Sequence, residues 1–152
     1  MKVYTLYREQ FLPITLKAAW DFFSTPANLA KITPEDMGFT IVSKLDEGGI
    51  YKGMHIEYRV APLLGIKMKW ITEIGAVEPP YKFVDMQLKG PYALWEHTHT
   101  FIETDGGVMM TDEVRYAIPF GILGQIAHAI MVKKRLHDIF DFRAETLKKF
   151  FK

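Results

Sequence analysis

The apolar residues of the C-terminal segment recur with a helical period. They are spaced by three or four residues from Phe120 to Lys152, with one gap at Lys133. The positions are Ile122, Ile126, Ile130, Leu136, Phe140, Ala144, Leu147 and Phe151. This spacing predicts one long helix with at most one break. At 1.5 Å per residue the helix would be about 45 Å long, so it must bury its apolar stripe against the rest of the chain.

The N-terminal segment combines a strand pattern with two short helical patterns. Lys2 to Leu12 mixes β-branched, aromatic and polar residues and stops at a proline, which predicts a strand. The pattern does not decide which face of this strand is buried. Thr15 is a predicted N-cap for a short amphipathic helix that ends near Ser24. Asn28 to Ile32 predicts a second short helix directly after it.

The middle of the chain changes to a period of two, which is typical of strands. Turn signals occur at Asp46–Gly49 and at Thr104–Gly107, and Pro79-Pro80 closes a strand between them. The connections are short enough for antiparallel neighbours, so we expect a meander. The fold class is therefore α+β, with seven antiparallel strands, all helices on one face, and a single domain over residues 1–152. The predicted strands after the first are 39–44, 51–60, 67–78, 83–89, 92–103 and 108–118.

Composition restricts the classes of function. Aromatic residues make up 14% of the chain, more than a minimal core needs, which indicates either a bulky core or a lined cavity. The net charge of +1 argues against a nucleic-acid-binding surface. The absence of cysteine excludes disulfides, thiol nucleophiles and cysteine metal sites. No segment resembles a signal peptide or a membrane span, so we expect a soluble cytoplasmic protein.

The most informative strand alternates aromatic residues with histidines. Trp95, His97, His99 and Phe101 share one face, which should point inward. On the neighbouring strand the more apolar face consists of Met110, Asp112, Val114, Tyr116 and Ile118. Buried polar groups need partners, and the residues that would supply one another are His97, His99, Asp112 and Tyr116.

Several interpretations of these polar residues stay open. They form a structural network that fixes the hairpin, or they bind the polar end of an apolar ligand. Alternatively, a histidine and a carboxylate act as general base and acid. The His-x-His spacing also suits a metal site completed by Asp112, but it is weak evidence, and we expect neither a metal nor a cofactor. His55, His128 and His137 are predicted to be surface or boundary residues.

Two apolar segments with glycines remain, at residues 61–65 and 119–124. They could frame the mouth of a cavity, touch a membrane or a partner protein, or fold inward. The sequence does not separate these alternatives.

The element order and several motifs resemble the SRPBCC superfamily, which includes START lipid-transfer domains, polyketide cyclases and relatives of the birch-pollen allergen. The resemblance covers essentially the whole chain and rests on Leu12-Pro13-Ile14, Ala19–Phe23, Pro26–Leu29, Ile32–Pro34, Gly90–Tyr92, Trp95–Phe101, Met110–Asp112, Val114, Tyr116 and Pro119–Gly121. It implies a helix-grip fold, in which a curved seven-stranded sheet surrounds a long C-terminal helix, with two short helices after the first strand. It also implies a deep hydrophobic cavity, used in different members for lipids, sterols, hormones or polyketides. Only some members are enzymes, and fold alone does not choose between them.

The leading prediction is therefore binding or transport of a small hydrophobic molecule between the sheet and the C-terminal helix. The first alternative is a cyclase or dehydratase in which His97 or His99 is the base and Asp112 or Tyr116 its partner. The second is a protein-interaction module that uses the apolar loops, and transient membrane contact through them is also expected. The sequence specifies neither the ligand nor the oligomeric state. The predicted ligand contacts are Met54, Ile56, Tyr58, Met68, Trp70, Trp95, His97, His99, Phe101, Asp112, Tyr116, Ile126 and Ile130.

Overall fold

A computed structural model describes residues 1–45, 49–62 and 65–152. In these residues one antiparallel sheet contains seven strands in the order β1-β7-β6-β5-β4-β3-β2. All neighbours except β1 and β7 are consecutive in sequence, so the predicted meander is confirmed. The strands are β1 Tyr4–Leu12, β2 Thr40–Ile41, β3 His55–Val60, β4 Met68–Glu78, β5 Lys82–Lys89, β6 Leu94–Thr104 and β7 Gly107–Ala117.

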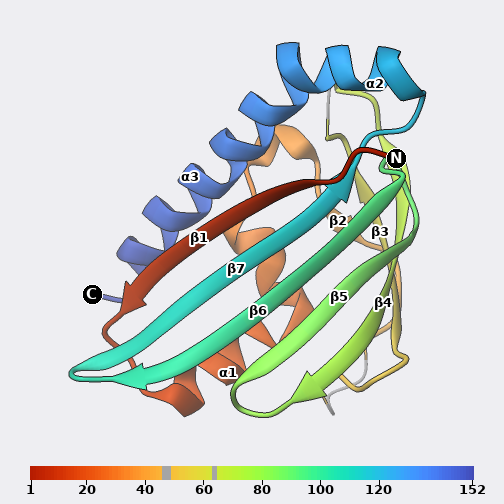
Figure 1. Ribbon diagram of the computed structural model, residues 1–152. Coiled ribbons are helices and arrows are strands. Elements are labelled where there is room, and N and C mark those ends of the chain that lie inside the picture. The colour runs from red at the N-terminus through yellow and green to blue at the C-terminus, as the bar shows by residue number, and fades with distance from the viewer. Residues whose placement is uncertain (46–48, 63–64) are drawn as a thin grey trace.

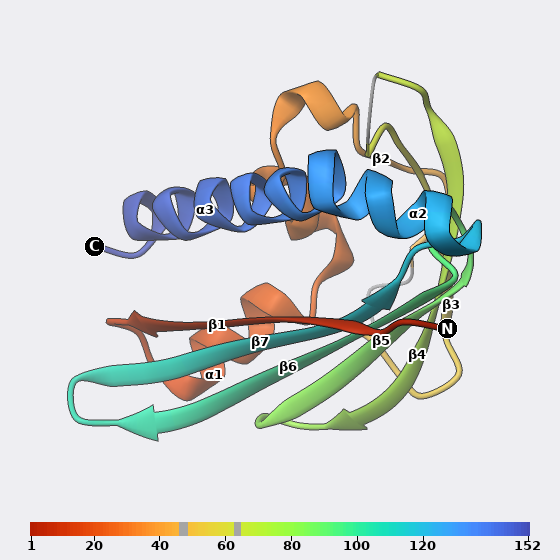
Figure 2. The ribbon, with the colours of Figure 1, turned by 45° about the horizontal axis from the view of Figure 1, so that its top comes forward.

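The helices lie on one side of this curved sheet, with the C-terminal helix crossing it and α1 beneath its far end (Figures 1 and 2). This arrangement confirms the predicted α+β class and the helix-grip fold. The helical segments are α1 Leu16–Phe23, the 3-10 helices η1 Pro26–Ile32 and η2 Glu35–Met37, α2 Gly121–Ala127, the π-helix η3 His128–Val132 and α3 Lys133–Phe150.

The first helix forms where the sequence predicts it. The Thr15 hydroxyl accepts a hydrogen bond from the backbone N–H of Ala18 at 3.1 Å, which satisfies one free donor of the first turn. Ala19 is fully buried, and the Trp20 ring meets the edges of Phe83 and Phe101 on the sheet. The helix therefore closes the end of the sheet near the β6–β7 hairpin.

The inward face of β1 is more polar than an apolar pattern would suggest. Leu6 and Leu12 are buried, and between them Arg8 and Gln10 point toward α3. Arg8 pairs with the Asp141 carboxylate at 2.7 Å, and the Gln10 amide donates to the carbonyl of Ala144 at 2.9 Å. These polar contacts join the edge strand to α3, which explains why hydrophobicity alone did not decide the buried face.

The predicted strands differ from the structure at their ends, by one or two residues in five strands and by more in β2 and β3. Strand β2 has two residues, β3 begins at His55 and not at residue 51, and β5 gains Lys82. The predicted turn at 46–49 and the apolar loop at 61–65 lie partly outside the described residues. The β6–β7 hairpin turns at the predicted Thr104–Gly107 sequence.

The C-terminal helix runs unbroken from α2 through η3 into α3, as the sequence predicts, but its buried stripe changes phase. In α3, Leu136, Phe140 and Leu147 are buried as expected. In α2 and η3 the expected stripe is wrong, because Ile122, Ile126 and Ile130 are exposed.

The buried positions of this first part are Gly124, His128 and Val132. A π-helix closes i→i+5 hydrogen bonds and has a wider turn than an α-helix. The π-helical residues therefore rotate the preceding turns relative to α3. A strict 3.6-residue period, extended backward from α3, selects the wrong face.

Candidate functional site

A cavity of about 190 Å³ lies between the sheet, α1, η1 and α3. Its wall is mostly apolar and comes from residues far apart in the chain. Six predicted ligand contacts line it: Ile56, Tyr58, Trp70, Trp95, His97 and His99. The lining also includes two charged residues, Asp85 and Arg143, that complete its polar end.

The other predicted contacts lie outside the lining. Met54, Phe101 and Tyr116 are buried in the packed clusters that surround the cavity, and Asp112 lies behind the histidines. Met68 is exposed at the start of β4. Ile126 and Ile130 are exposed because of the phase change at the π-helix, so the expectation that they face the cavity is corrected.

The polar end of the cavity begins with His97 on β6. Its Nε2 atom lies 2.7 Å from Oδ1 of Asp112, which is on the neighbouring strand β7. Both side chains are buried, and the His97 ring is stacked on His99 at 3.7 Å between centroids. The hairpin therefore brings His97, His99 and Asp112 together, as the alternation predicted.

The second histidine is paired with a residue that sequence reasoning missed. Nε2 of His99 lies 2.6 Å from Oδ2 of Asp85, and in the register of β5 and β6 Asp85 is directly opposite His97. The apolar residues of β5 include Val84, Met86 and Leu88, so choosing the more apolar face would have turned Asp85 outward. The available signal was the need of two inward histidines for an anionic partner.

The fifth member is Arg143 on α3, also missed from the sequence. One guanidinium nitrogen lies 3.2 Å from Oδ1 of Asp112, and the group lies over the rings of Phe23 and Phe140 at 5.6 and 5.7 Å. Arg143 is 6% exposed. Its position, three residues after Phe140 and four before Leu147, places it on the buried stripe, where the apolar pattern had selected Ala144.

We call Asp85, His97, His99, Asp112 and Arg143 the charge cluster. Burial alone would raise the pKa of both carboxyl groups, but the surrounding cations outweigh it. Arg143 and the histidines hold the pKa of Asp112 well below its usual range. His99, His97 and Arg143 likewise lower the pKa of Asp85. Both carboxylates are therefore ionised at neutral pH.

The two histidines differ in proton affinity. Burial and the neighbouring His99 lower the pKa of His97. Burial would also lower the pKa of His99, but Asp112 and Asp85 outweigh it and raise that pKa. His99 therefore binds a proton more strongly than His97 does.

Two buried nitrogen atoms of the cluster have no hydrogen-bond partner among the described residues. Nε of Arg143 is buried without a hydrogen bond among the described residues. Nδ1 of His99 also lacks one, although it lies 3.4 Å from Oδ1 of Asp112. Arg143 and His99 both line the cavity. The polar end therefore combines residues that line the cavity with a buried donor that has no partner among the described residues.

Asp85, His97 and His99 are also the residues that could hold a metal ion. Each offers one ligand atom, and these atoms lie within 4.8 Å of one another. The sequence pattern suggested Asp112 as the third ligand, but in the structure the third ligand would be Asp85. A metal would have to replace the proton between His99 and Asp85, since these atoms are already hydrogen-bonded at 2.6 Å.

Tyr116 does not join the charge cluster. Its hydroxyl lies 2.7 Å from Nε2 of His128, and the His128 ring is stacked on Tyr4 at 3.5 Å. His128 is buried, which corrects its prediction as a surface or boundary residue. His55 is exposed beside Glu73, and His137 lies next to Arg8 at the helix surface.

Comparisons with known proteins identify the fold. No protein-family model and no curated protein matches the chain. Among solved structures, a START superfamily protein from Mycobacterium smegmatis has a TM-score of 0.70 at 13% identity, covering 97% of this chain and 96% of that one. Protein Ms6760 from the same organism has a TM-score of 0.66 at 19% identity, covering 99% and 98%. Ara h 8.0201 has a TM-score of 0.58 at 17% identity, covering 97% and 99%. The chain therefore has the SRPBCC-like helix-grip fold.

Proposed function

We propose that the protein binds a small, mostly apolar molecule that carries a hydrogen-bond acceptor at one end. The observation that carries this proposal is Arg143, a buried cation that lines the apolar cavity and whose Nε–H has no partner among the described residues. A buried donor without a partner costs about 1–3 kcal/mol. A ligand oxygen that accepts this hydrogen bond recovers that free energy, and apolar contacts supply the rest of the affinity.

The size of the cavity limits the ligand. A cavity of about 150 Å³ is large enough for benzene, whereas drug-sized ligands occupy roughly 300–1,000 Å³. At about 190 Å³, this cavity matches a single substituted ring or a short chain. A whole sterol would require the wall to move.

The charge balance of the cluster favours a neutral ligand. The two carboxylates already have partners, since Asp112 contacts Arg143 and His97, and Asp85 contacts His99, whose pKa is raised. A ligand carboxylate would add an unmatched buried charge, which is costly in an apolar environment. A carbonyl or hydroxyl oxygen accepts the same hydrogen bond without this cost.

The test compares three probes of similar size: acetophenone, ethylbenzene and benzoate. We expect isothermal titration calorimetry to show tighter binding of the ketone than of either other compound. In Arg143→Lys and Arg143→Met the preference for the ketone over the hydrocarbon should disappear, while ethylbenzene binds as before. Arg115→Met removes an exposed cation on β7 and is the matched control. Equal affinity of the wild type for ketone and hydrocarbon would refute the role of Arg143, and no binding of any probe would refute the cavity itself.

A second candidate function, acid–base catalysis on the bound molecule, is favoured by the His97–Asp112 pair. His97 lines the cavity, its lowered pKa keeps it neutral at pH 7, and Asp112 orients the ring. Such a base would abstract a proton next to a ligand carbonyl. NMR in D₂O would then detect exchange of the acetophenone methyl protons, lost in His97→Gln while the ketone still binds. If the methyl protons exchange only at the uncatalysed rate with the wild-type protein, catalysis is refuted and binding is the one proposed function that remains.

A further inference from the structure

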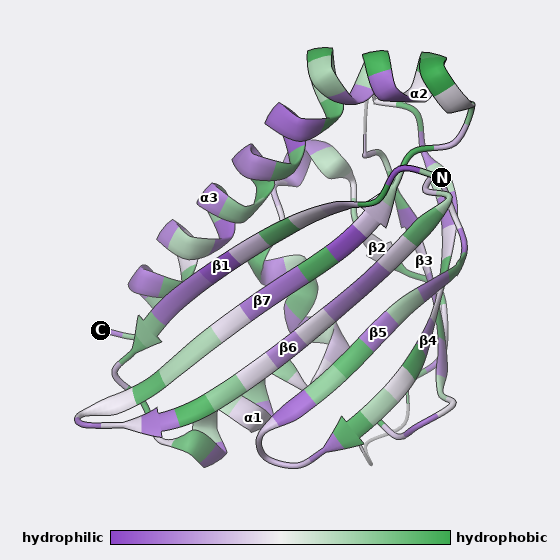
Figure 3. Cartoon of the chain, in the orientation of Figure 1, coloured by the Kyte–Doolittle hydropathy of each residue, from purple (hydrophilic) through white to green (hydrophobic). Residues whose placement is uncertain are grey.

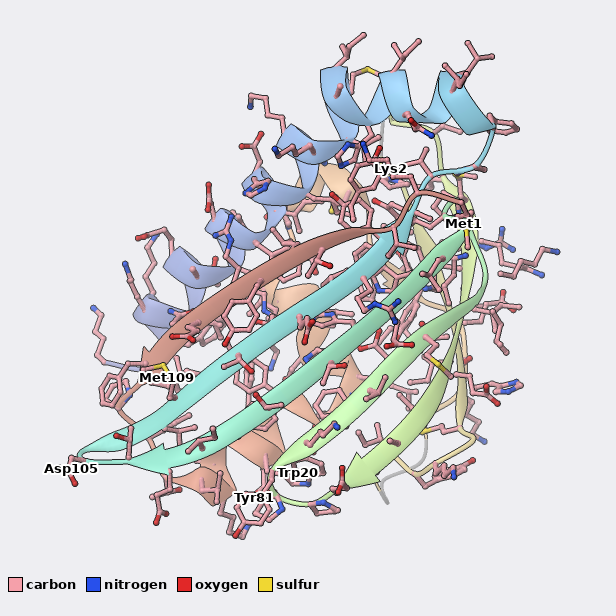
Figure 4. All side chains as sticks on the ribbon, in the orientation of Figure 1. Met1, Lys2, Trp20, Tyr81, Asp105 and Met109 are labelled. Carbon is pink, nitrogen blue, oxygen red and sulfur yellow. The ribbon has the colours of Figure 1, made fainter. Side chains whose placement is uncertain are left out.

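The outer side of the C-terminal helix has an unusual concentration of exposed apolar side chains at its beginning. We call this surface the apolar end. Its members are Phe120, Ile122, Leu123, Ile126 and Ile130, which are 82%, 75%, 74%, 51% and 70% exposed. Figure 3 shows the corresponding apolar colouring of α2 and the turns that follow, and in Figure 4 side chains project from this helix away from the sheet.

The packing of α2 fixes this orientation. Gly124 is buried, and a Cβ atom added there would lie 2.0 Å from the carbonyl oxygen of Pro119. The helix thus contacts the preceding turn through its smallest residue, with His128 buried four residues later. The large side chains of α2 are left on the opposite side, so their exposure follows from the fold itself.

Phe120 gives independent support for an external contact. Its backbone has φ 73°, the left-handed region that a residue with a Cβ atom rarely occupies. Within the protein, packing of the ring does little to offset this strain, because Phe120 is 82% exposed. Strained residues that persist at a surface often have a functional reason.

The charges around the apolar end indicate the kind of partner. No acidic residue occurs from Val114 to His137. Lys133 and Lys134 are exposed one turn after Ile130. At the other side, Lys2 helps to line a hollow with Phe120, and Figure 4 shows the N-terminal residues beside the segment that leads into α2. The cations around this apolar surface are therefore Lys2, Lys133 and Lys134, and Lys134 also pairs with Asp138 at 2.7 Å.

We propose that the apolar end docks onto the surface of an anionic phospholipid bilayer. An interfacial helix buries its apolar side at the boundary between headgroups and acyl chains, while nearby lysines meet the anionic headgroups. No helix within the described residues is long and apolar enough to cross a membrane, so the contact is peripheral. This inference does not depend on the cavity ligand.

Vesicle co-sedimentation tests the proposal with the intact protein. The probes are phosphatidylcholine vesicles with and without phosphatidylglycerol. We expect binding to the anionic vesicles, and at least a tenfold weaker partition for the double variant Leu123→Asp/Ile126→Asp. Ile102→Asp is the matched control, because Ile102 is 60% exposed on β6 and outside the apolar end. It should leave binding within about twofold of the wild type.

The lysines provide a separate measurement. Lys133→Gln and Lys134→Gln should each weaken binding to anionic vesicles about fivefold at low salt, and added salt should reduce the difference. No vesicle binding by the wild type would overturn the proposal. Equal binding by the double variant would also overturn it. A dimer in analytical ultracentrifugation that Leu123→Asp dissociates, without vesicle binding, would assign the surface to a second copy of the chain.

Probe binding separates this inference from the proposed function. Leu123 and Ile126 do not line the cavity, so the double variant should bind acetophenone like the wild type. Loss of vesicle binding with retained ketone binding supports the docking surface alone. Loss of both would indicate a folding defect, which circular dichroism detects; the single variant Ile122→Ser then repeats the vesicle test with a milder change.

Discussion

The charge cluster and the apolar end reverse the usual distribution of side chains in opposite ways. The first places four ionisable groups in the interior next to the partly buried Asp85, and the second places five large apolar groups in water. Inside, the charges contact one another, since Asp112 touches both histidines and Arg143. Outside, the apolar residues have little to pack against within their own chain. A buried polar group is costly unless it is paired, whereas an exposed apolar group is tolerated until a partner covers it.

This comparison predicts the largest stability loss for Asp112→Ala. The substitution removes the carboxylate shared by His97 and Arg143 and leaves a buried guanidinium without its counter-ion. Breaking a buried ion pair costs about 3–5 kcal/mol. Urea unfolding should show this loss, whereas Asp138→Ala, which removes an exposed pair with Lys134, should cost less than about 1 kcal/mol. Similar losses for the two variants would contradict the central role of Asp112.

The second prediction compares two leucines on the same helix. Leu136 is 4% exposed and packs against the sheet, whereas Leu123 is 74% exposed. Leu136→Ala should lower the free energy of unfolding by about 2–5 kcal/mol, because it leaves a cavity. Leu123→Asp should change it by less than about 0.5 kcal/mol and should raise solubility. A large loss for Leu123→Asp in urea unfolding would show that the apolar end packs within the protein.

The third prediction concerns the pH dependence of stability. The lowered pKa of His97 means that the unfolded chain binds its proton first, so stability falls as the pH drops below about 6.5. The raised pKa of His99 has the opposite sign, and its contribution is lost as the pH rises through its folded pKa. We therefore expect maximal stability near pH 6.5, with a further loss near pH 4 and below as Asp85 and Asp112 are protonated.

Urea midpoints measured from pH 4 to pH 9 would test this assignment. His97→Gln should flatten the fall just below about pH 6.5, and His99→Gln should flatten the fall above it. His55→Gln, at an exposed site outside the charge cluster, is the control for removing a histidine. If His97→Gln and His99→Gln flattened the same side, the two proton affinities would be assigned wrongly.

Sequence patterns predicted the fold better than the site, for physical reasons that individual residues show. Alternation placed His97, His99 and Asp112 on the same side of two neighbouring strands, because every second side chain of a strand points to the same side of the sheet. It missed Asp85, which lies on the less apolar face of β5, and Arg143, which interrupts the apolar stripe of α3. Both are stabilised inside by partners distant in sequence. Local patterns contain no information about such pairs.

The helix shows a different limit of prediction. Its existence and its extent over α2 to α3 followed from the apolar spacing, but Ile126 and Ile130 were placed on the wrong side. His128 and Val132 are the buried residues of the π-helix. The number of residues per turn is larger there than in an α-helix, and a fixed 3.6-residue period does not include this change.

The smallest expected effect tests the strain at Phe120. Glycine occupies the left-handed region readily, whereas a residue with a Cβ atom is disfavoured there by about 1–2 kcal/mol. Phe120→Gly should therefore raise the free energy of unfolding, by up to about 1 kcal/mol after the greater freedom of glycine in the unfolded chain is subtracted. Phe120→Ala keeps the strain and removes the same ring, so it should give no gain. If the glycine variant is more stable in urea unfolding but binds anionic vesicles more weakly, the aromatic ring is retained for the surface contact at the expense of stability. If both variants bind the vesicles as tightly as the wild type, docking involves only the helical residues that follow Phe120.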